Sequence, residues 1–197
     1  MTDYGLGIVF GTGYIAEENK KKYAVVRNLD SYYAKTLEKE TAYRAYESKN
    51  KINRDGKAQW CIKIRNISEL PLYLEIENKQ DFIRAYMELH AMLDLRNAKD
   101  RRGNQIKRLR LRIFGNEKII SWINNTLPAK TKKVQHIKNI VDSHYIGETC
   151  CIYYQSEPEI LNILKWIDGK PKNENVWLKW EDIVESKKTG ADIVFHE

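Results

Sequence analysis

The sequence has few of the residues that hold small secreted proteins together, and no segment that could cross a membrane. It contains three cysteines and four prolines in 197 residues. Cys61, Cys150 and Cys151 are odd in number, and cysteines adjacent in sequence rarely bond to each other, so we expect all three to be reduced packing residues. No apolar stretch approaches the roughly 20 residues that span a bilayer, and the N-terminus lacks an export signal. We therefore expect a cytoplasmic protein with no membrane partner.

Familiar catalytic and metal-binding signatures are also missing. His90, His136, His144 and His196 show neither the H-E-x-x-H pattern nor a paired cysteine and histidine spacing. The G-x-S-x-G turn of serine hydrolases is absent as well. The sequence thus predicts no metal site and no cofactor.

One apparent nucleotide-binding motif fails on its surroundings. Residues 11–16, Gly-Thr-Gly-Tyr-Ile-Ala, satisfy the G-x-G-x-x-A pattern of dinucleotide-binding proteins. That fold needs a long helix directly afterwards, packed on the sheet by an apolar stripe. Residues 17–22 are polar throughout and Tyr23 already begins a strand pattern. These surroundings argue against the nucleotide interpretation.

Positive charge is plentiful and concentrated. The formal net charge is +7, which favours a polyanionic partner without requiring one. In residues 96–112 the only acid is Asp100, and such a cluster is typical of contacts to a phosphate backbone. Residues 49–54 form a smaller basic segment. The DNA-binding candidates from these two segments are Arg96, Lys99, Arg101, Arg102, Lys107, Arg108, Arg110, Arg112, Lys49 and Lys51.

Alternation in two predicted strands separates an apolar face from a basic face. In residues 108–114, leucine and isoleucine alternate with arginine, and like charges so close repel each other unless anions lie over them. In residues 59–65, Trp60, Ile62 and Ile64 alternate with polar residues. The alternative is an ordinary solvated face. The second strand adds Gln59, Lys63 and Arg65 to the DNA-binding candidates, with Cys61 on the same face.

The chain also repeats one order of elements, which predicts repeats at 1–79 and 80–168 and an extension at 169–197. Each half begins with an apolar helix, at 4–11 and at 81–91, the latter started by Asn78. A hairpin with a clear strand follows, at 23–27 and 108–114, and then a second helix. A later hairpin turns near Asp55 in one half and near Ile146 and Gly147 in the other, and residues 68–79 join the halves. The predicted apolar helix positions are Tyr33, Leu37, Ile119, Ile120, Ile123, Leu127, Ile160, Leu161, Leu164 and Ile167.

Residues 4–15, Tyr-Gly-Leu-Gly-Ile-Val-Phe-Gly-Thr-Gly-Tyr-Ile, resemble the first motif of the LAGLIDADG homing endonucleases, and residues 82–91, Phe-Ile-Arg-Ala-Tyr-Met-Glu-Leu-His-Ala, resemble the second. The resemblance covers residues 4–167. It implies an α+β fold of two α-β-β-α-β-β-α repeats, with two antiparallel sheets forming a saddle over DNA. The motif helices would pack through small residues, although the glycines could instead simply end a short helix. The predicted repeat interface consists of Gly7, Gly11, Ala85 and Leu89, of which Leu89 departs from the small residue usual there.

The acids that the resemblance implies are missing. In the family, an Asp or Glu at the foot of each motif helix holds the divalent cations that promote phosphodiester cleavage. Those two positions fall on Thr12 and His90, and Phe10 replaces a further acid one turn earlier. Glu88 is the only carboxylate in either motif. The resemblance therefore implies a nuclease fold without its catalytic residues.

We interpret the chain as a monomeric, non-cleaving protein that binds double-stranded DNA, a regulator derived from a phage or mobile-element nuclease. One alternative is a protein-interaction module or phage-encoded inhibitor that binds a host protein, suggested by Trp177, Trp180, Ile183 and Val184 at near-helical spacing. Those residues would equally suit a closing helix packed on the body. The other alternative is a residual metal-dependent endonuclease that uses Glu88 with a second acid.

Overall fold

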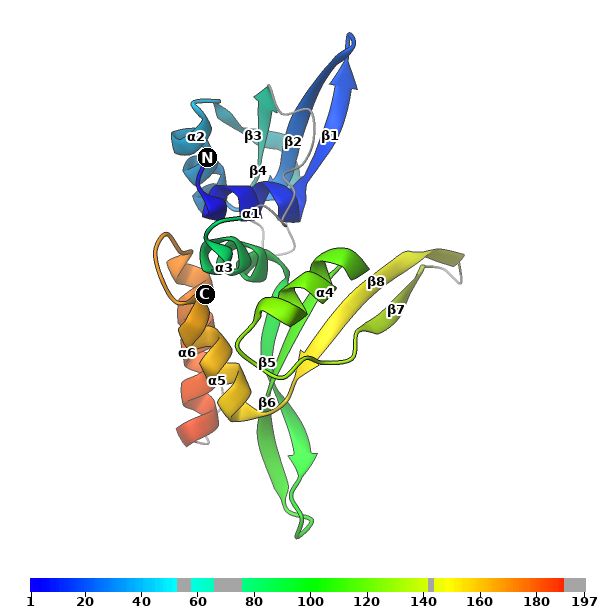
Figure 1. The fold of residues 1–197 in the computed structure, drawn as a ribbon, viewed down its shortest axis with the longest axis vertical. Coiled ribbons are helices and arrows are strands. Elements are labelled where there is room, and N and C mark those ends of the chain that lie inside the picture. Colours follow the sequence, from blue (N-terminus) through cyan, green and yellow to red (C-terminus); the bar gives the residue numbers. More distant parts are fainter. Residues whose placement is uncertain (53–57, 66–75, 142–143, 190–197) are drawn as a thin grey trace. The chain divides into compact units, whose positions relative to one another are not determined.

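The fold divides into two compact units, each an antiparallel sheet with helices. The computed structural model describes residues 1–52, 58–65, 76–141 and 144–189, and only the backbone at 28, 49–52, 140–141 and 144–146. Unit 1 comprises Met1–Leu89 with Gly169–Asn173, and unit 2 comprises His90–Asp168 with Glu174–Glu197. Each unit contains one four-stranded sheet (Figure 1). The predicted α+β class with two antiparallel sheets is confirmed.

Unit 1 alternates helices with hairpins in the predicted order. Its sheet has the strand order β1-β2-β4-β3, and its core gathers Ile8 of the first helix, Val26 and Ile62 of the sheet, and Leu37 of the second helix. The elements are α1 (Asp3–Thr12), β1 (Gly13–Glu18), β2 (Lys21–Leu29), α2 (Ser31–Thr41), β3 (Ala45–Ile52), β4 (Ala58–Arg65) and α3 (Lys79–His90), whose last residue belongs to unit 2.

The ends of α1 follow from local chemistry. The Thr2 side chain accepts a hydrogen bond from the Gly5 backbone, which satisfies one of the free N–H groups of the first turn. At the other end, the Gly13 N–H donates to the Val9 carbonyl, and a Cβ at Gly13 would lie 2.4 Å from that oxygen. Glycine thus lets the chain leave the helix directly into β1. Residues 11–16 therefore run from helix to strand, the reverse of a dinucleotide-binding unit.

Unit 2 repeats the order of two hairpins with a helix between them, and its first hairpin is longer. Its strand order is β5-β6-β8-β7, and β5 and β6 continue past the helices as a two-stranded arm (Figure 1). The predicted apolar face of β6 is buried, as are Ile119, Ile120 and Ile123, which confirms both patterns. The elements are β5 (Ala91–Lys99), β6 (Gln105–Gly115), α4 (Glu117–Thr126), β7 (Gln135–Val141), β8 (His144–Tyr154), α5 (Glu157–Ile167) and α6 (Glu174–Thr189).

Two sequence predictions in unit 2 are wrong. The turn expected near Ile146 and Gly147 lies elsewhere, because β8 begins at His144 and runs through both residues. Gly147 has φ +141 and pairs with Asn139 where the register shifts, so this glycine serves a β-bulge. In α5, Leu161 is exposed and Ile163 is buried in its place. The buried stripe therefore follows Ile160, Ile163 and Ile167.

The C-terminal extension is divided between the two units: residues 169–173 belong to unit 1 and residues 174–197 to unit 2. Within unit 1, Arg84 Nη1 donates to the Pro171 carbonyl at 3.3 Å. Within unit 2, α6 packs against β5 and β6 and buries Trp177, Trp180 and Ile183. The aromatic residues that suggested a protein partner are therefore used inside the molecule.

Two predicted segments of unit 1 lie partly or wholly outside the residues that the structure describes. The turn at Arg54-Asp55-Gly56 and most of the joining segment 68–79 lie outside the described residues. Within the described residues, no helix is both long and apolar enough to span a membrane.

Candidate nucleic-acid interface

The β5–β6 hairpin of unit 2 carries a row of arginines on the face opposite its core. Residues paired across two strands project to the same side of a sheet. Leu93 pairs with Leu111 and both are buried, whereas the neighbouring pairs project the other way. We call this side the arginine face; it consists of Asp94 paired with Arg110, Arg96 paired with Arg108, and Arg112.

Asp94 organises this face. Its carboxylate receives Arg110 Nε and Nη2, each at 2.8 Å, and Arg112 Nη2 at 2.5 Å. Partial burial favours the neutral acid, but the hydrogen bonds and charges of Arg110 and Arg112 outweigh it and lower the pKa of Asp94. The two arginines are thus held side by side by an acid that lies just outside the basic segment recognised in the sequence. Asp94 therefore offsets part of the charge that the sequence assigned to this strand.

Two nitrogen atoms on the arginine face lack partners. Arg96 Nε and Arg112 Nε are buried and have no hydrogen-bond partner among the described residues. Both atoms are covered by neighbouring groups, so neither is open to an external acceptor in this structure. Arg108, in contrast, is exposed and can contact anionic oxygens.

The remaining basic candidates of unit 2 divide between the tip and the other side. Lys107 pairs with Asn97 and Lys99 with Gln105, which places both lysines on the side opposite the arginine face. Arg101 and Arg102 are exposed at the tip. There the Asp100 carboxylate accepts from the Arg102 backbone at 2.8 Å, so this acid shapes the turn, and its hydrogen bonds to Asn104 lower the pKa of Asp100. The eight basic residues therefore do not form one surface.

Unit 1 has a different open face, built on tyrosine. Arg27 stacks over the Tyr14 ring at 5.4 Å, and Lys63 over the Tyr23 ring at 5.2 Å. Tyr23 pairs with Arg65 across β2 and β4. We call this side the tyrosine face; it consists of Tyr14, Tyr23, Arg27, Tyr46, Gln59, Cys61, Lys63 and Arg65.

Part of the tyrosine face was absent from the sequence prediction. Tyr14, Tyr23 and Arg27 were missed because Val25, on the same side of β2, is apolar and blurs the alternation. Cys61 donates to the Tyr46 hydroxyl at 3.3 Å, and this bond with burial raises the pKa of Tyr46 to about 12. Lys49 and Lys51 lie in β3, and of these two residues the structure describes the backbone alone.

The motif helices α1 and α3 meet within unit 1. A Cβ at Gly7 would lie 2.5 Å from the Phe82 carbonyl and 2.9 Å from Ala85 Cβ, so glycine is what permits this approach. Farther along α1, the Phe10 ring lies 5.8 Å from that of Phe82. Gly11 is half-buried in the next turn, and Leu89 packs on the unit 1 core.

The two helix feet do not offer the ligands that hard divalent cations prefer. Mg²⁺ binds carboxylate and other oxygen ligands in strict octahedral geometry. Thr12, which ends α1, donates its hydroxyl to the Ile8 carbonyl at 3.1 Å. His90 ends α3 and supplies an imidazole, which suits transition metals better. Neither residue supplies a carboxylate oxygen, the ligand type that Mg²⁺ prefers.

Glu88, the one motif carboxylate, has a structural environment inside unit 1. It is 7% exposed and accepts hydrogen bonds from the Tyr4 hydroxyl at 2.5 Å and the Tyr33 hydroxyl at 3.4 Å. Its other oxygen accepts the Asn173 N–H at 3.2 Å. Burial and then the charge of Glu88 raise the pKa of both tyrosines, which keeps them protonated as donors. The contacts of Glu88 thus join α1, α2 and the extension.

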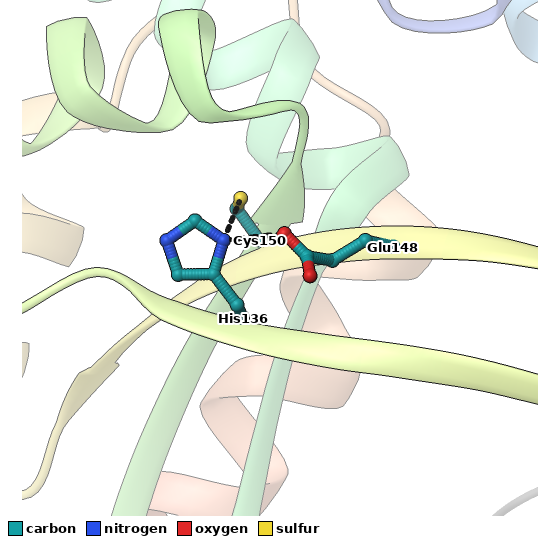
Figure 2. A group of neighbouring side chains, drawn as sticks. All are labelled: His136, Glu148 and Cys150. Carbon is teal, nitrogen blue, oxygen red and sulfur yellow. Dashed lines mark hydrogen bonds and ion pairs between the residues drawn. The ribbon is translucent and has the colours of Figure 1, made fainter.

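A separate group of potential metal ligands lies in unit 2. Ligand atoms of His136, Glu148 and Cys150 lie within 4.8 Å of one another (Figure 2). The group could not be predicted from a β7–β8 turn near Ile146, because that turn would move the partner of His136 beyond Cys150. With the observed register, His136 pairs directly with Cys150. The three residues are brought together by strand pairing, and their spacing in the sequence does not indicate a site.

The comparisons with known proteins agree on the fold. No protein-family model and no curated protein sequence matches the chain. Among solved structures, the LAGLIDADG meganuclease I-AabMI bound to uncleaved DNA matches with a TM-score of 0.66 at 8% identity, covering 96% of this chain and 91% of that one. The I-LtrWI LAGLIDADG homing endonuclease bound to target DNA matches with a TM-score of 0.60 at 13% identity, covering 95% and 90%. The chain therefore has the LAGLIDADG homing endonuclease fold, as the motif resemblance implied.

Proposed function

We propose that this chain is a DNA-binding protein that binds duplex DNA without cleaving it. The observation that carries the proposal is the arginine face of unit 2, where paired strands present arginines on one side and bury leucines on the other. Arginine forms bidentate hydrogen bonds with phosphate and with guanine in the major groove. Arg96 and Arg108 would contact phosphates, while Asp94 fixes Arg110 and Arg112 for recognition of bases.

The structural neighbours support a nucleic-acid partner. The structures of I-AabMI and I-LtrWI contain DNA. The tyrosine face of unit 1 adds exposed aromatic rings and further cations, and mixed aromatic and basic surfaces suit nucleic acid. Each unit thus offers a face suited to DNA.

Two features of the chain support the absence of cleavage. Thr12 and His90 stand at the helix feet in place of acids. Glu88 is held by Tyr4, Tyr33 and the Asn173 backbone inside unit 1, so its oxygens already have partners. A bound protein that does not cut would block access to its site, and we therefore propose a regulatory role for a single copy of the chain.

Selection of bound duplexes from a random pool tests this proposal, followed by affinity measurements on the recovered site across a series of salt concentrations. We expect an asymmetric site and a steep fall of affinity with salt, since phosphate contacts release counterions. Light scattering of the complex should give one chain per duplex. Failure to bind any duplex at low salt would overturn DNA binding.

The same recovered site tests cleavage separately. The protein is incubated with a plasmid that carries the site and with Mg²⁺ or Mn²⁺, and the plasmid is examined for nicks. We expect the plasmid to stay supercoiled. Site-specific nicking would overturn the non-cleaving assignment and leave DNA binding intact.

A further inference from the structure

We propose that His136, Glu148 and Cys150 bind a transition-metal ion of the zinc class at the edge of the unit 2 sheet. This site is independent of the DNA-binding faces and of the helix feet. It would fasten β7, an edge strand of its sheet, to β8.

Strand register brings the three ligands together. His136 on β7 pairs directly with Cys150 on β8, so the two side chains project from the same side of the sheet. Glu148 precedes Cys150 by two residues on one strand and shares that side, since side chains alternate along a strand. Figure 2 shows the imidazole, the thiol and the carboxylate directed toward one another. The pairing of β7 with β8 therefore places the three side chains next to one another.

The distances suit a small tetrahedral ion after a minor adjustment. Zinc bonds of about 2.0–2.3 Å at tetrahedral angles place ligand atoms about 3.3–3.7 Å apart. Cys150 Sγ already lies 3.6 Å from His136 Nδ1. Glu148 Oε1 lies 2.5 Å from the same nitrogen, so the carboxylate must withdraw by about 1 Å to admit an ion. The Glu148 side chain is 37% exposed and is free to rotate outward.

The present contacts leave one atom shared between two partners. His136 Nδ1 faces both the Glu148 carboxylate and the Cys150 sulfur. A single proton on this nitrogen can donate to only one of them at a time. A metal ion in place of that proton would bind imidazole, carboxylate and thiolate together. Water would complete the fourth position, because His136 and Glu148 are exposed.

The ligand types select the metal class. Thiolate and imidazole favour Zn²⁺, Co²⁺ and Ni²⁺, whereas Mg²⁺ prefers an all-oxygen site. The proposed site is therefore chemically distinct from a carboxylate site for a hard cation. The adjacent Cys151 pairs with Phe114 and projects to the opposite side of the sheet, which makes it a natural control.

Titration of the reduced protein with Co²⁺ tests the proposal, because a cobalt–thiolate bond produces a charge-transfer absorption in the near ultraviolet. We expect a band that saturates at one ion per chain. Cys150→Ser should abolish it, and Cys151→Ser should leave it unchanged. A wild-type protein without the band, or a band that survives in Cys150→Ser, would overturn the site.

The exposed ligands provide variants that keep the fold. His136→Ala and Glu148→Gln each remove one ligand from a partly solvated side chain, and each should weaken Zn²⁺ binding at least about tenfold by competition with a chromophoric chelator. Far-ultraviolet circular dichroism checks that both variants are folded. Unchanged zinc affinity in folded His136→Ala would refute the assignment even if Cys150→Ser failed to fold.

Discussion

The two open faces hold their cations by different means. On the tyrosine face of unit 1, Arg27 and Lys63 lie over aromatic rings, at 5.4 and 5.2 Å from the ring centroids. On the arginine face of unit 2, Arg110 and Arg112 are bound to the carboxylate of Asp94. An aromatic ring leaves the positive charge of its cation unneutralised. A carboxylate neutralises one positive charge, and here it fixes the orientation of two guanidinium groups. Unit 1 is therefore suited to adaptable contacts, and unit 2 to oriented ones.

The two units also use their central carboxylates differently. Glu88 is enclosed in unit 1 by hydroxyl and backbone donors, and Asp94 lies on a half-exposed surface among guanidinium groups. Although only six positions separate them in the sequence, one stabilises the interior and the other shapes a binding surface. Substitutions at these positions should therefore separate stability from binding.

The largest effect is expected for Glu88→Gln. An amide in this buried position cannot accept from Tyr4, Tyr33 and Asn173 together, and it weakens bonds that now involve a charged group. We expect the free energy of unfolding to fall by about 2–3 kcal/mol in chemical denaturation. DNA affinity of the folded protein should be unchanged. The exposed Glu47→Gln is the matched control; equal stability of the two variants would contradict the structural role of Glu88.

Asp94→Asn should lower the free energy of unfolding by less than Glu88→Gln does, and it should raise non-specific DNA affinity. Loss of the carboxylate removes charge-assisted hydrogen bonds from Arg110 and Arg112, and we expect unfolding to become easier by about 1–2 kcal/mol at neutral pH. Because one negative charge leaves the arginine face, non-specific DNA affinity should rise and its dependence on salt should steepen. Weaker non-specific binding in this variant would mean that Asp94 aids DNA contact chiefly by positioning the arginines.

The same variant carries a pH signature. The pKa of Asp94 is lower in the folded protein than the unfolded value of about 3.9, so its stabilisation is present above that pH and is lost as pH falls through the folded pKa. The stability difference between wild type and Asp94→Asn should therefore shrink on acidification below about pH 4. A difference that stays constant in this range would exclude ionised Asp94 as its source.

The smallest effect is expected at Tyr14, which tests the tyrosine face. Tyr14→Leu removes the ring beneath Arg27, and we expect duplex affinity to fall by about two- to fivefold, corresponding to a cation–π interaction of about 0.5–1 kcal/mol. Tyr14→Phe keeps a ring and should retain most of the affinity. If both variants lost affinity equally, the hydroxyl and not the ring would be responsible.

Local patterns in the sequence predicted the elements well, because their chemistry is local. Asn116 accepts from the Ile119 N–H and starts α4, and the alternation in β6 correctly assigned Leu109 and Leu111 to the core. Gly147 shows the limit of such reasoning. A glycine can serve a turn or a bulge, and only the pairing of β7 with β8 distinguishes the two.

The site was harder to predict because it depends on contacts across strands. A count of charges in residues 96–112 could not include Asp94, which lies just outside that segment. Its carboxylate forms ion pairs with Arg110 and Arg112 on the neighbouring strand. Nor could the count place Lys99 and Lys107 on the opposite side from Arg96 and Arg108, since this follows from the register of the hairpin. Register is set by the whole sheet and is therefore not contained in any one segment.

That register supplies the most direct test of the account. Arg96→Ala with Arg108→Ala, and Lys99→Ala with Lys107→Ala, each remove two positive charges from the same hairpin, on opposite sides. Fluorescence anisotropy on the selected duplex should show about a tenfold or greater loss for the arginine pair, with a salt dependence lower by about two counterions, and less than about a threefold loss for the lysine pair. Equal losses for the two pairs would contradict the central claim that DNA binds on the arginine face.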